Sequence, residues 1–170
     1  MTRRKSLLAS LLFTVTVPGT VAGLIPWLIT GWRGAGPLFG FPGGRAVGAI
    51  LIALGTSVLL LAIFKFASEG RGTPLPTVPT QHLVISGPNR FVRNPMYLAV
   101  VSIIPGQAVL LGQQPLLWYA ALVALATASF VHFYEEPALR SQFGDEYLHY
   151  RNSVRAWLPR IRPYDELKDS

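Results

Sequence analysis

Residues 93–136 of the chain read RNPMYLAVVSIIPGQAVLLGQQPLLWYAALVALATASFVHFYEE. The stretch opens with a polar cluster, Arg93 to Tyr97, and closes with the acidic pair Glu135 and Glu136. Two apolar segments lie between these clusters, and only Gly112 to Pro115 connect them. A connection of this length forces the two segments into an antiparallel hairpin. The chain therefore returns to its starting side, and we expect the two polar clusters to lie close together.

Charged side chains at the ends of apolar segments are costly unless they have polar partners. Two clusters at matching depth therefore suggest a shared polar ligand. A second reading is that Arg90 and Arg93 only anchor a helix at lipid headgroups, while Glu135 and Glu136 extend into water. Spacing alone does not choose between these two readings.

The composition is typical of a membrane protein. Of the 170 residues, 51% are hydrophobic and 14% are charged, and the mean hydropathy is +0.40. Four apolar stretches each approach the ~20 residues that a helix needs to cross a bilayer. We predict an all-α polytopic membrane protein, a single membrane domain over 1–170, with about four transmembrane helices at 6–30, 46–66, 96–112 and 115–134. The alternatives are a buried soluble core or, for the first stretch, a signal peptide.

The basic residues indicate an orientation in the membrane. Thirteen of the 15 lysines and arginines fall in the N-terminus, in 65–95 or in the C-terminal tail, and two fall in the first loop between helices. By the positive-inside rule, both termini face the cytoplasm, and we predict a cytoplasmic (inner) membrane protein with both polar clusters on the cytoplasmic side. This distribution, with no recognition module, argues against a nucleic-acid partner. Because the chain has no cysteine and three scattered histidines, we expect no metal site.

Small residues and prolines indicate how the helices pack. Spacing predicts packing faces at three sets of positions, which a self-association interface could also use: Gly19 and Gly23; Ala49 and Ala53; Ala120, Ala124 and Ala128. We expect Pro18, Pro26 and Pro105 to kink or interrupt their helices, and neighbouring groups to replace the lost backbone hydrogen bonds.

The segments outside the apolar stretches have their own patterns. Glycines and prolines predict a loop over 68–79, residues 82–85 fit a short strand or a re-entrant piece, and 86–89 fit a turn. Beyond Glu136, apolar residues recur every three or four positions and predict an amphipathic helix that lies on the membrane or covers the helix bundle. Its apolar face comprises Leu139, Phe143, Tyr147, Tyr150 and Val154.

The side chains of the two clusters limit the chemistry of a shared ligand. A guanidinium and an amide, as in Arg93 and Asn94, suit a carboxylate, while Glu135 or Glu136 suits a ribose diol, an ammonium or an amide edge. S-adenosylmethionine carries a carboxylate, an ammonium and a ribose. Phosphate headgroups would also attract Arg93.

Three blocks of residues carry a resemblance to known proteins. They are GPNRFVRNPMY at 87–97, EEPAL at 135–139 and FGDEYLHY at 143–150, with Val154 and Leu158-Pro159 after them. In this order, separated by two apolar segments, the blocks resemble the isoprenylcysteine carboxyl methyltransferase and phospholipid methyltransferase superfamily. The resemblance covers about residues 80–160.

The resemblance implies an integral membrane methyltransferase that uses S-adenosylmethionine, with a core at 80–160 and a cofactor pocket on the cytoplasmic side. The methyl acceptor would be a lipid-like or small hydrophobic molecule with a carboxylate, an amine or another nucleophile, reached from the membrane lipids. Glu135 is the favoured direct contact to the cofactor. The matching cofactor-binding positions are His82, Leu83, Val84, Gly87, Arg93, Asn94, Pro95, Tyr97, Glu135 and Glu136.

No residue is identified as catalytic by the resemblance alone. Tyr147, Tyr150 and Arg151 match the substrate end, and Glu136, His149 or a tyrosine could assist if the acceptor is an amine or a hydroxyl. His149 also fits an ordinary interfacial residue. The alternative function is a non-enzymatic membrane protein that binds lipid or a partner subunit, in which the polar clusters serve as interface anchors.

Three positions depart from the pattern of the superfamily. Asn94 stands where a histidine is often found, and Asn89 stands where a tyrosine is often found, so roles of an imidazole or a phenol do not transfer. Val131 stands where the branch that acts on prenylated proteins has an arginine associated with substrate. This last departure weakens prenylcysteine as the substrate.

Overall fold

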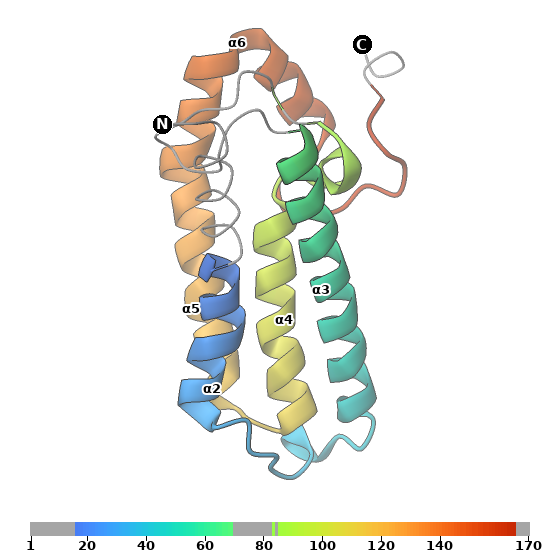
Figure 1. Cartoon of the computed structure of the whole chain (residues 1–170), viewed down its shortest axis with the longest axis vertical. Helices are drawn as coiled ribbons and strands as arrows, with labels where there is room; N and C mark the ends of the chain where they lie inside the picture. The colour runs from blue at the N-terminus through green and yellow to red at the C-terminus, as the bar shows by residue number, and fades with distance from the viewer. Residues whose placement is uncertain (1–15, 70–82, 84, 166–170) are drawn as a thin grey trace. The chain divides into compact units, whose positions relative to one another are not determined.

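The computed structural model describes residues 16–69, 83 and 85–165, and this part of the chain contains helices and no strand. Contacts group the described residues into two compact units. The first, the apolar unit, comprises Thr16–Leu59 and Met96–Ala128, and the second, the polar unit, comprises the described parts of Leu60–Pro95 and Ser129–Ser170. Figure 1 shows the α-helices, which are α2 (Ile25–Thr30), α3 (Gly44–Glu69), α4 (Pro95–Leu111), α5 (Pro115–Phe130) and α6 (Glu136–Ser153).

The all-helical prediction is confirmed for the described residues. Helices α3 and α4 coincide with the predicted segments 46–66 and 96–112 to within three residues, and α5 with the π-helical turn Val131–Glu135 covers 115–134. The segment 6–30 is described from Thr16, where a helix runs to Thr30, and its first ten residues lie outside the described part. Two helices in the described ranges, Gly44–Lys65 and Pro115–Ser153, are long and apolar enough to cross a membrane, while Thr16–Thr30 and Pro95–Leu111 are apolar but shorter.

Pro26 interrupts the first helix, as the sequence predicts. Because Pro26 has no N–H, the Ala22 carbonyl loses its normal helical donor, and the turn before it widens into a π-helix, Thr20–Leu24. The Ile25 N–H bonds to Thr20, which also leaves the Val21 carbonyl without its α-helical donor. Side chains replace both donors: Gln107 Nε2 donates to the Ala22 oxygen at 2.6 Å. Tyr119 donates its hydroxyl proton to the Val21 oxygen at 2.9 Å.

These replacements tie α4 and α5 to the first helix. Gln107 lies in α4 and is buried, and its Oε1 also accepts a hydrogen bond from Trp32 Nε1 at 3.3 Å. A buried amide is tolerated only when its polar atoms have partners, and here both ends of the side chain do. Pro105, by contrast, lies inside α4 without ending it.

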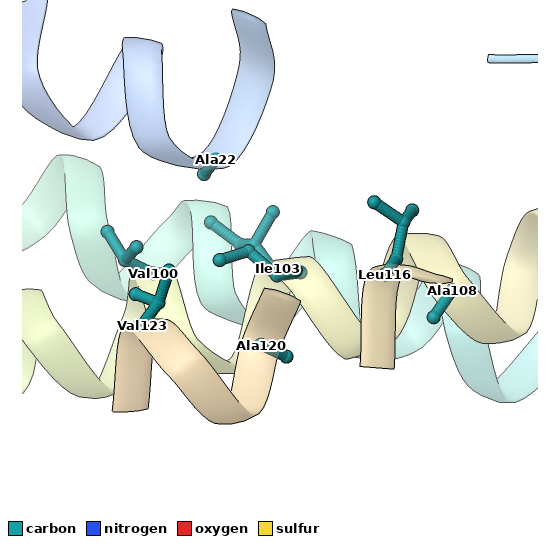
Figure 2. Packing of buried hydrophobic residues seen from close by; sticks show 8 residues of the cluster. Ala22, Val100, Ile103, Ala108, Leu116, Ala120 and Val123 are labelled. Atoms are coloured by element: carbon teal, nitrogen blue, oxygen red, sulfur yellow. The ribbon is translucent and has the colours of Figure 1, made fainter. Parts of the chain in front are cut away.

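The core of the apolar unit is formed by small and branched side chains. Figure 2 shows them gathered from the first helix, α4 and α5, and Ile104, Ala108 and Leu116 within this cluster are fully buried. Ala120, from one predicted packing face, is part of the cluster. Removing such apolar surface from water contributes about 25 cal/mol per Å² to the free energy of folding.

Helices α3 and α4 approach each other at glycines. A Cβ atom on Gly48 would lie 2.5 Å from the Leu110 nitrogen and 2.6 Å from the Gly106 oxygen. A Cβ on Gly55 would lie 3.1 Å from the Ala99 oxygen. The seven-residue spacing from Gly48 to Gly55 places both on one face of α3.

The faces predicted at Ala49 with Ala53 and at Gly19 with Gly23 make no such contact among the described residues, and their use in self-association stays a prediction. Both alanines are exposed, because the face of α3 that meets α4 carries Gly48 and Gly55. Cβ atoms on Gly19 and Gly23 would meet no described residue within 4 Å. Small residues occur on several faces of these helices, so spacing alone did not select the one in contact.

The close approach of α3 and α4 makes Gly48 sensitive to any side chain. We expect Gly48→Ala to lower the free energy of unfolding by about 1–3 kcal/mol, because the new methyl group would meet backbone atoms that cannot rotate away. The measurement is the thermal unfolding midpoint of the detergent-purified protein. Gly23→Ala, where a Cβ would meet no described residue within 4 Å, is the matched control and should leave the midpoint unchanged or slightly higher. Equal midpoints for the two variants would contradict the packing of α3 against α4.

In the polar unit, α6 packs through its predicted apolar face. Tyr147, Tyr150 and Val154 are buried together with Tyr164, and Leu139 and Phe143 pack against them. The helix bends at Gly144, whose φ of 54° and ψ of −123° exclude residues with a Cβ. The remaining contacts of this cluster come from Leu83 and Ile85, which form no strand.

Candidate functional site

Arg93 lies in the polar unit two residues before α4 begins. It follows the 3₁₀ turn Gly87–Arg90, which confirms the turn predicted from the glycine and proline there. The backbone N–H of Arg93 donates to the Arg155 oxygen at 3.0 Å, and its side-chain Nε donates to the Val154 oxygen at 2.8 Å. Both acceptors belong to the chain that leaves α6. Arg93 is thus fixed at its backbone and at its side chain by the same segment.

This segment, residues 154–165, is here termed the strap. Its backbone continues along the residues that precede Arg93: Arg160 N–H donates to the Phe91 oxygen and Tyr164 N–H to the Arg90 oxygen, both at 2.8 Å. Arg90 returns a hydrogen bond from Nε to the Tyr164 oxygen at 2.6 Å. The residues from Arg90 to Arg93 are therefore held to the strap.

The two polar clusters meet directly. Arg93 Nη1 lies 2.5 Å from Glu136 Oε1, and Arg151 Nη2 lies 3.3 Å from Glu136 Oε2. Arg93 Nη1 also donates to the Tyr147 hydroxyl at 3.0 Å. The side chains of Arg93 and Glu136 are only 11% and 14% exposed. The sequence predicted that these clusters lie together, and in the structure a carboxylate rather than a separate ligand joins the two arginines.

A π-helical turn sets the direction of the acidic pair. Helix α5 continues into Val131–Glu135, and the Glu136 N–H bonds to the Val131 oxygen. Pro137 follows at once, in the same relation to this turn as Pro26 has to the turn in the first helix. A π turn contains one residue more than an α turn and so rotates the side chains that follow it; such turns are frequent at functional sites. Apolar spacing does not predict this turn, although Pro137 is a signal for it.

The remaining acid, Glu135, is the last residue of that turn. Its Oε2 atom is buried. A buried carboxylate oxygen needs positively charged or hydrogen-bond-donating surroundings. Of the acidic pair, Glu136 meets the two arginines, and Glu135 precedes it in the chain with one buried carboxylate oxygen.

The tyrosines of the site are neutral at physiological pH. Burial raises the pKa of the Tyr147 hydroxyl above its ordinary value, and the positive charge of Arg93 opposes this shift. Burial also raises the pKa of Tyr150. Tyr150 donates its proton to the Asn89 oxygen at 2.6 Å, so it holds the turn rather than the ion pairs. Tyr147 is 2% exposed, accepts from Arg93, and keeps its own proton as a donor.

The other predicted site residues fall into several groups. Leu83 packs against the tyrosine cluster, and Gly87, with a φ of 55°, lies against the Lys65 side chain. Pro95 is buried at the start of α4, and Tyr97 follows in that helix. His149 is exposed, with its ring 6.5 Å from Tyr164. His82 and Val84 lie outside the described residues.

The three positions that depart from the superfamily have structural contacts. Asn94 is buried and donates from Nδ2 to the Ala156 oxygen at 3.3 Å, so it fastens the strap next to Arg93. The Asn89 backbone accepts from Tyr150. Val131 is 3% exposed and begins the π turn.

Glu136 compensates a cation that has little access to water. We expect Glu136→Gln to lower the free energy of unfolding by about 1–3 kcal/mol, because Arg93 would keep its desolvated charge without a carboxylate partner. Thermal unfolding in detergent measures the effect. Glu146→Gln, an exposed acid on the same helix, is the control and should change the midpoint little. An equally small change for Glu136→Gln would contradict the importance of this ion pair.

A comparison with family models gives one match. A model described as phospholipid methyltransferase matches residues 44–146, which include α3, α4, α5, the π turn and the first part of α6. The matched range contains Arg93, Glu135 and Glu136. No curated protein and no solved structure matches the chain.

Proposed function

The chain belongs to the phospholipid methyltransferase family, and on that premise we propose that it transfers the methyl group of S-adenosylmethionine to a lipid-like or small hydrophobic acceptor. The observation that carries the proposal is the cluster of Arg93, Glu136 and Tyr147, and Glu135 is next to Glu136 in the chain. The family accounts for the kind of reaction and for the membrane setting. The proposed donor rests on the chemistry of these side chains.

The side chains at the cluster fit the amino-acid end of the cofactor. Among the described residues, Arg93 uses Nε and Nη1 in hydrogen bonds, which leaves the two N–H groups of Nη2 for a carboxylate. The Tyr147 proton is a second donor for the same group. The Glu135 carboxylate, with Oε2 buried, suits the ammonium. Glu136, which faces both arginines, would then orient Arg93 rather than contact the ligand.

The bound cofactor would supply an activated methyl group on a sulfonium. The protein would align the acceptor with that group and keep water out, and these two contributions can account for most of the rate enhancement in such a displacement. A carboxylate acceptor needs no base. For an amine or a hydroxyl acceptor a general base would have to take the proton, and Glu136 could do so only on leaving its ion pairs with Arg93 and Arg151.

The proposal includes a membrane topology. Four helices cross the cytoplasmic (inner) membrane with both termini inside, and the whole chain forms a single membrane domain. Support comes from the basic residues. Thirteen of the 15 lie in the N-terminus, in 65–95 or in the C-terminal tail, and the positive-inside rule assigns such segments to the cytoplasm. Arg93, Arg151 and Glu136 would then lie at the cytoplasmic surface, where S-adenosylmethionine is dissolved and lipid acceptors arrive from the bilayer.

The proposed acceptor is defined more broadly than a prenylated cysteine. An isoprenylcysteine carboxyl methyltransferase-like subtype is compatible with the blocks at 87–97 and 135–150. Val131 is buried at the start of the π turn and offers no charge to a substrate carboxylate. This favours an acceptor that is recognised mainly by its apolar part.

Binding of the cofactor tests the proposal. We expect the folded, detergent-purified protein to bind S-adenosylmethionine, and Glu135→Gln to weaken binding about 10- to 100-fold, because a charge-assisted hydrogen bond contributes ~1.5–3 kcal/mol. Isothermal titration calorimetry measures both affinities. Glutamine keeps the size of the side chain, so a loss of binding reports the charge.

The matched control is Glu146→Gln, which removes an exposed acid of α6 and should leave the affinity unchanged. Unfolding midpoints for all three proteins separate lost binding from lost folding. If the intact folded protein bound no S-adenosylmethionine, the proposed function would fail, and a lipid-binding or partner subunit would be favoured instead.

The acceptor class can be identified directly. Membranes that contain the protein are incubated with methyl-labelled S-adenosylmethionine, and we expect the label in the lipid extract or in a small hydrophobic product. Membranes with Glu135→Gln serve as the control and should incorporate much less label. Label that appears only in polypeptide would contradict the proposed acceptor class while leaving cofactor use intact.

A further inference from the structure

We propose that the strap, residues 154–165, docks on a membrane surface of anionic lipid headgroups through exposed apolar side chains and arginines. Leu158 is 61% exposed and Ile161 is 98% exposed. Two such exposed apolar side chains on one short segment of irregular backbone indicate a contact surface for a membrane or another partner. Arg155 and Arg162 on either side of them are exposed, and neither forms an ion pair with the described residues.

The charge pattern selects the partner. From Tyr147 to Tyr164 the chain carries four arginines and no acidic residue. One of them, Arg151, pairs with Glu136, and another, Arg160, lies over the Tyr164 ring. The strap ends in one acid, Asp165, and the exposed Arg155 and Arg162 form no ion pair with the described residues. A surface that attracts arginine and accepts isoleucine and leucine is the headgroup layer of an anionic membrane.

The position of the strap agrees with this partner. Arg155 and Ala156 accept hydrogen bonds from the Arg93 backbone and from Asn94, the two residues just before α4. Helix α4 begins at Pro95 and is apolar from there onward. The strap is therefore hydrogen-bonded to the polar residues just before an apolar helix. If that helix enters a membrane, these residues lie at the depth of the lipid headgroups.

The amphipathic helix α6 is a weaker candidate for this contact. The sequence alone left open whether its apolar face lies on the membrane or covers other residues. In the structure that face is buried against Leu83, Ile85 and Tyr164. Between Glu136 and Asp165, the large apolar side chains that remain exposed are Leu158 and Ile161 of the strap.

A label at position 161 tests the proposal, because the chain has no cysteine of its own. The full-length variant Ile161→Cys is labelled with an environment-sensitive fluorophore and reconstituted into vesicles of phosphatidylcholine, with or without phosphatidylglycerol. We expect a blue-shifted emission that lipids with a nitroxide near the headgroup quench. Spin-labelled phosphatidylglycerol should quench more than spin-labelled phosphatidylcholine. The control Asp145→Cys, on the exposed side of α6, should carry a label that remains in water.

A charge variant separates attraction to anionic lipid from simple insertion. In the Ile161→Cys background, Arg155→Gln and Arg162→Gln should each lower the preference for anionic lipid by up to about fivefold. Both side chains are exposed, so the fold should be retained.

Three outcomes would overturn the proposal. The first is a label as solvent-exposed as that of Asp145→Cys. The second is a blue-shifted label that no lipid quenches, which would indicate burial against protein. The third is equal quenching by neutral and anionic lipid. The test follows lipid contact and not turnover, so its result is independent of the proposed methyl transfer.

Discussion

The polar unit depends on one interaction, the pairing of the Arg93 guanidinium with Glu136. Arg93 also donates to the strap through its backbone and its Nε, so one residue joins the start of α4, the strap and α6. A cation that is 11% exposed is costly without an anion, and a salt bridge with little exposure is stabilising only while both partners are present. The strap, the π turn and the Tyr147 hydroxyl together hold this pair in one geometry.

This arrangement gives Arg93 two roles that do not compete. Nε and Nη1 are used inside the protein, while the N–H groups of Nη2 point to no acceptor among the described residues. In the proposed function, the first set fixes the guanidinium plane and the second binds a ligand carboxylate. A site of this kind is pre-organised, because its cationic group does not have to find its position when the ligand arrives.

Much of the architecture could be predicted from the sequence, and the failures have physical causes. The short connection at Gly112 to Pro115 predicted the meeting of the Arg93 and Glu136 clusters, and the heptad-like spacing after Glu136 predicted the buried face of α6. The contact face of α3 was predicted at the alanines rather than at Gly48. Small residues occur on several faces of that helix, and only the partner helix determines which face is used.

The π turns explain why the geometry of the site could not be predicted from the spacing of apolar residues alone. Periodicity assumes 3.6 residues per turn, but a proline removes one donor and lets the turn before it take up an extra residue. At Pro26 this frees carbonyls that Gln107 and Tyr119 then bind, and at Pro137 it changes which way the acidic pair faces. Proline positions therefore carry information about packing that apolar spacing does not.

The most direct test of the account is amide hydrogen–deuterium exchange of the purified protein with and without S-adenosylmethionine. If S-adenosylmethionine binds at Arg93, exchange should be slower at Arg93, at Glu136 and in the first residues of the strap, because the ligand would stabilise the pair that holds them. Little change is expected at Gly31, a backbone donor in the apolar unit. Unchanged exchange throughout the polar unit at saturating cofactor would contradict the central claim.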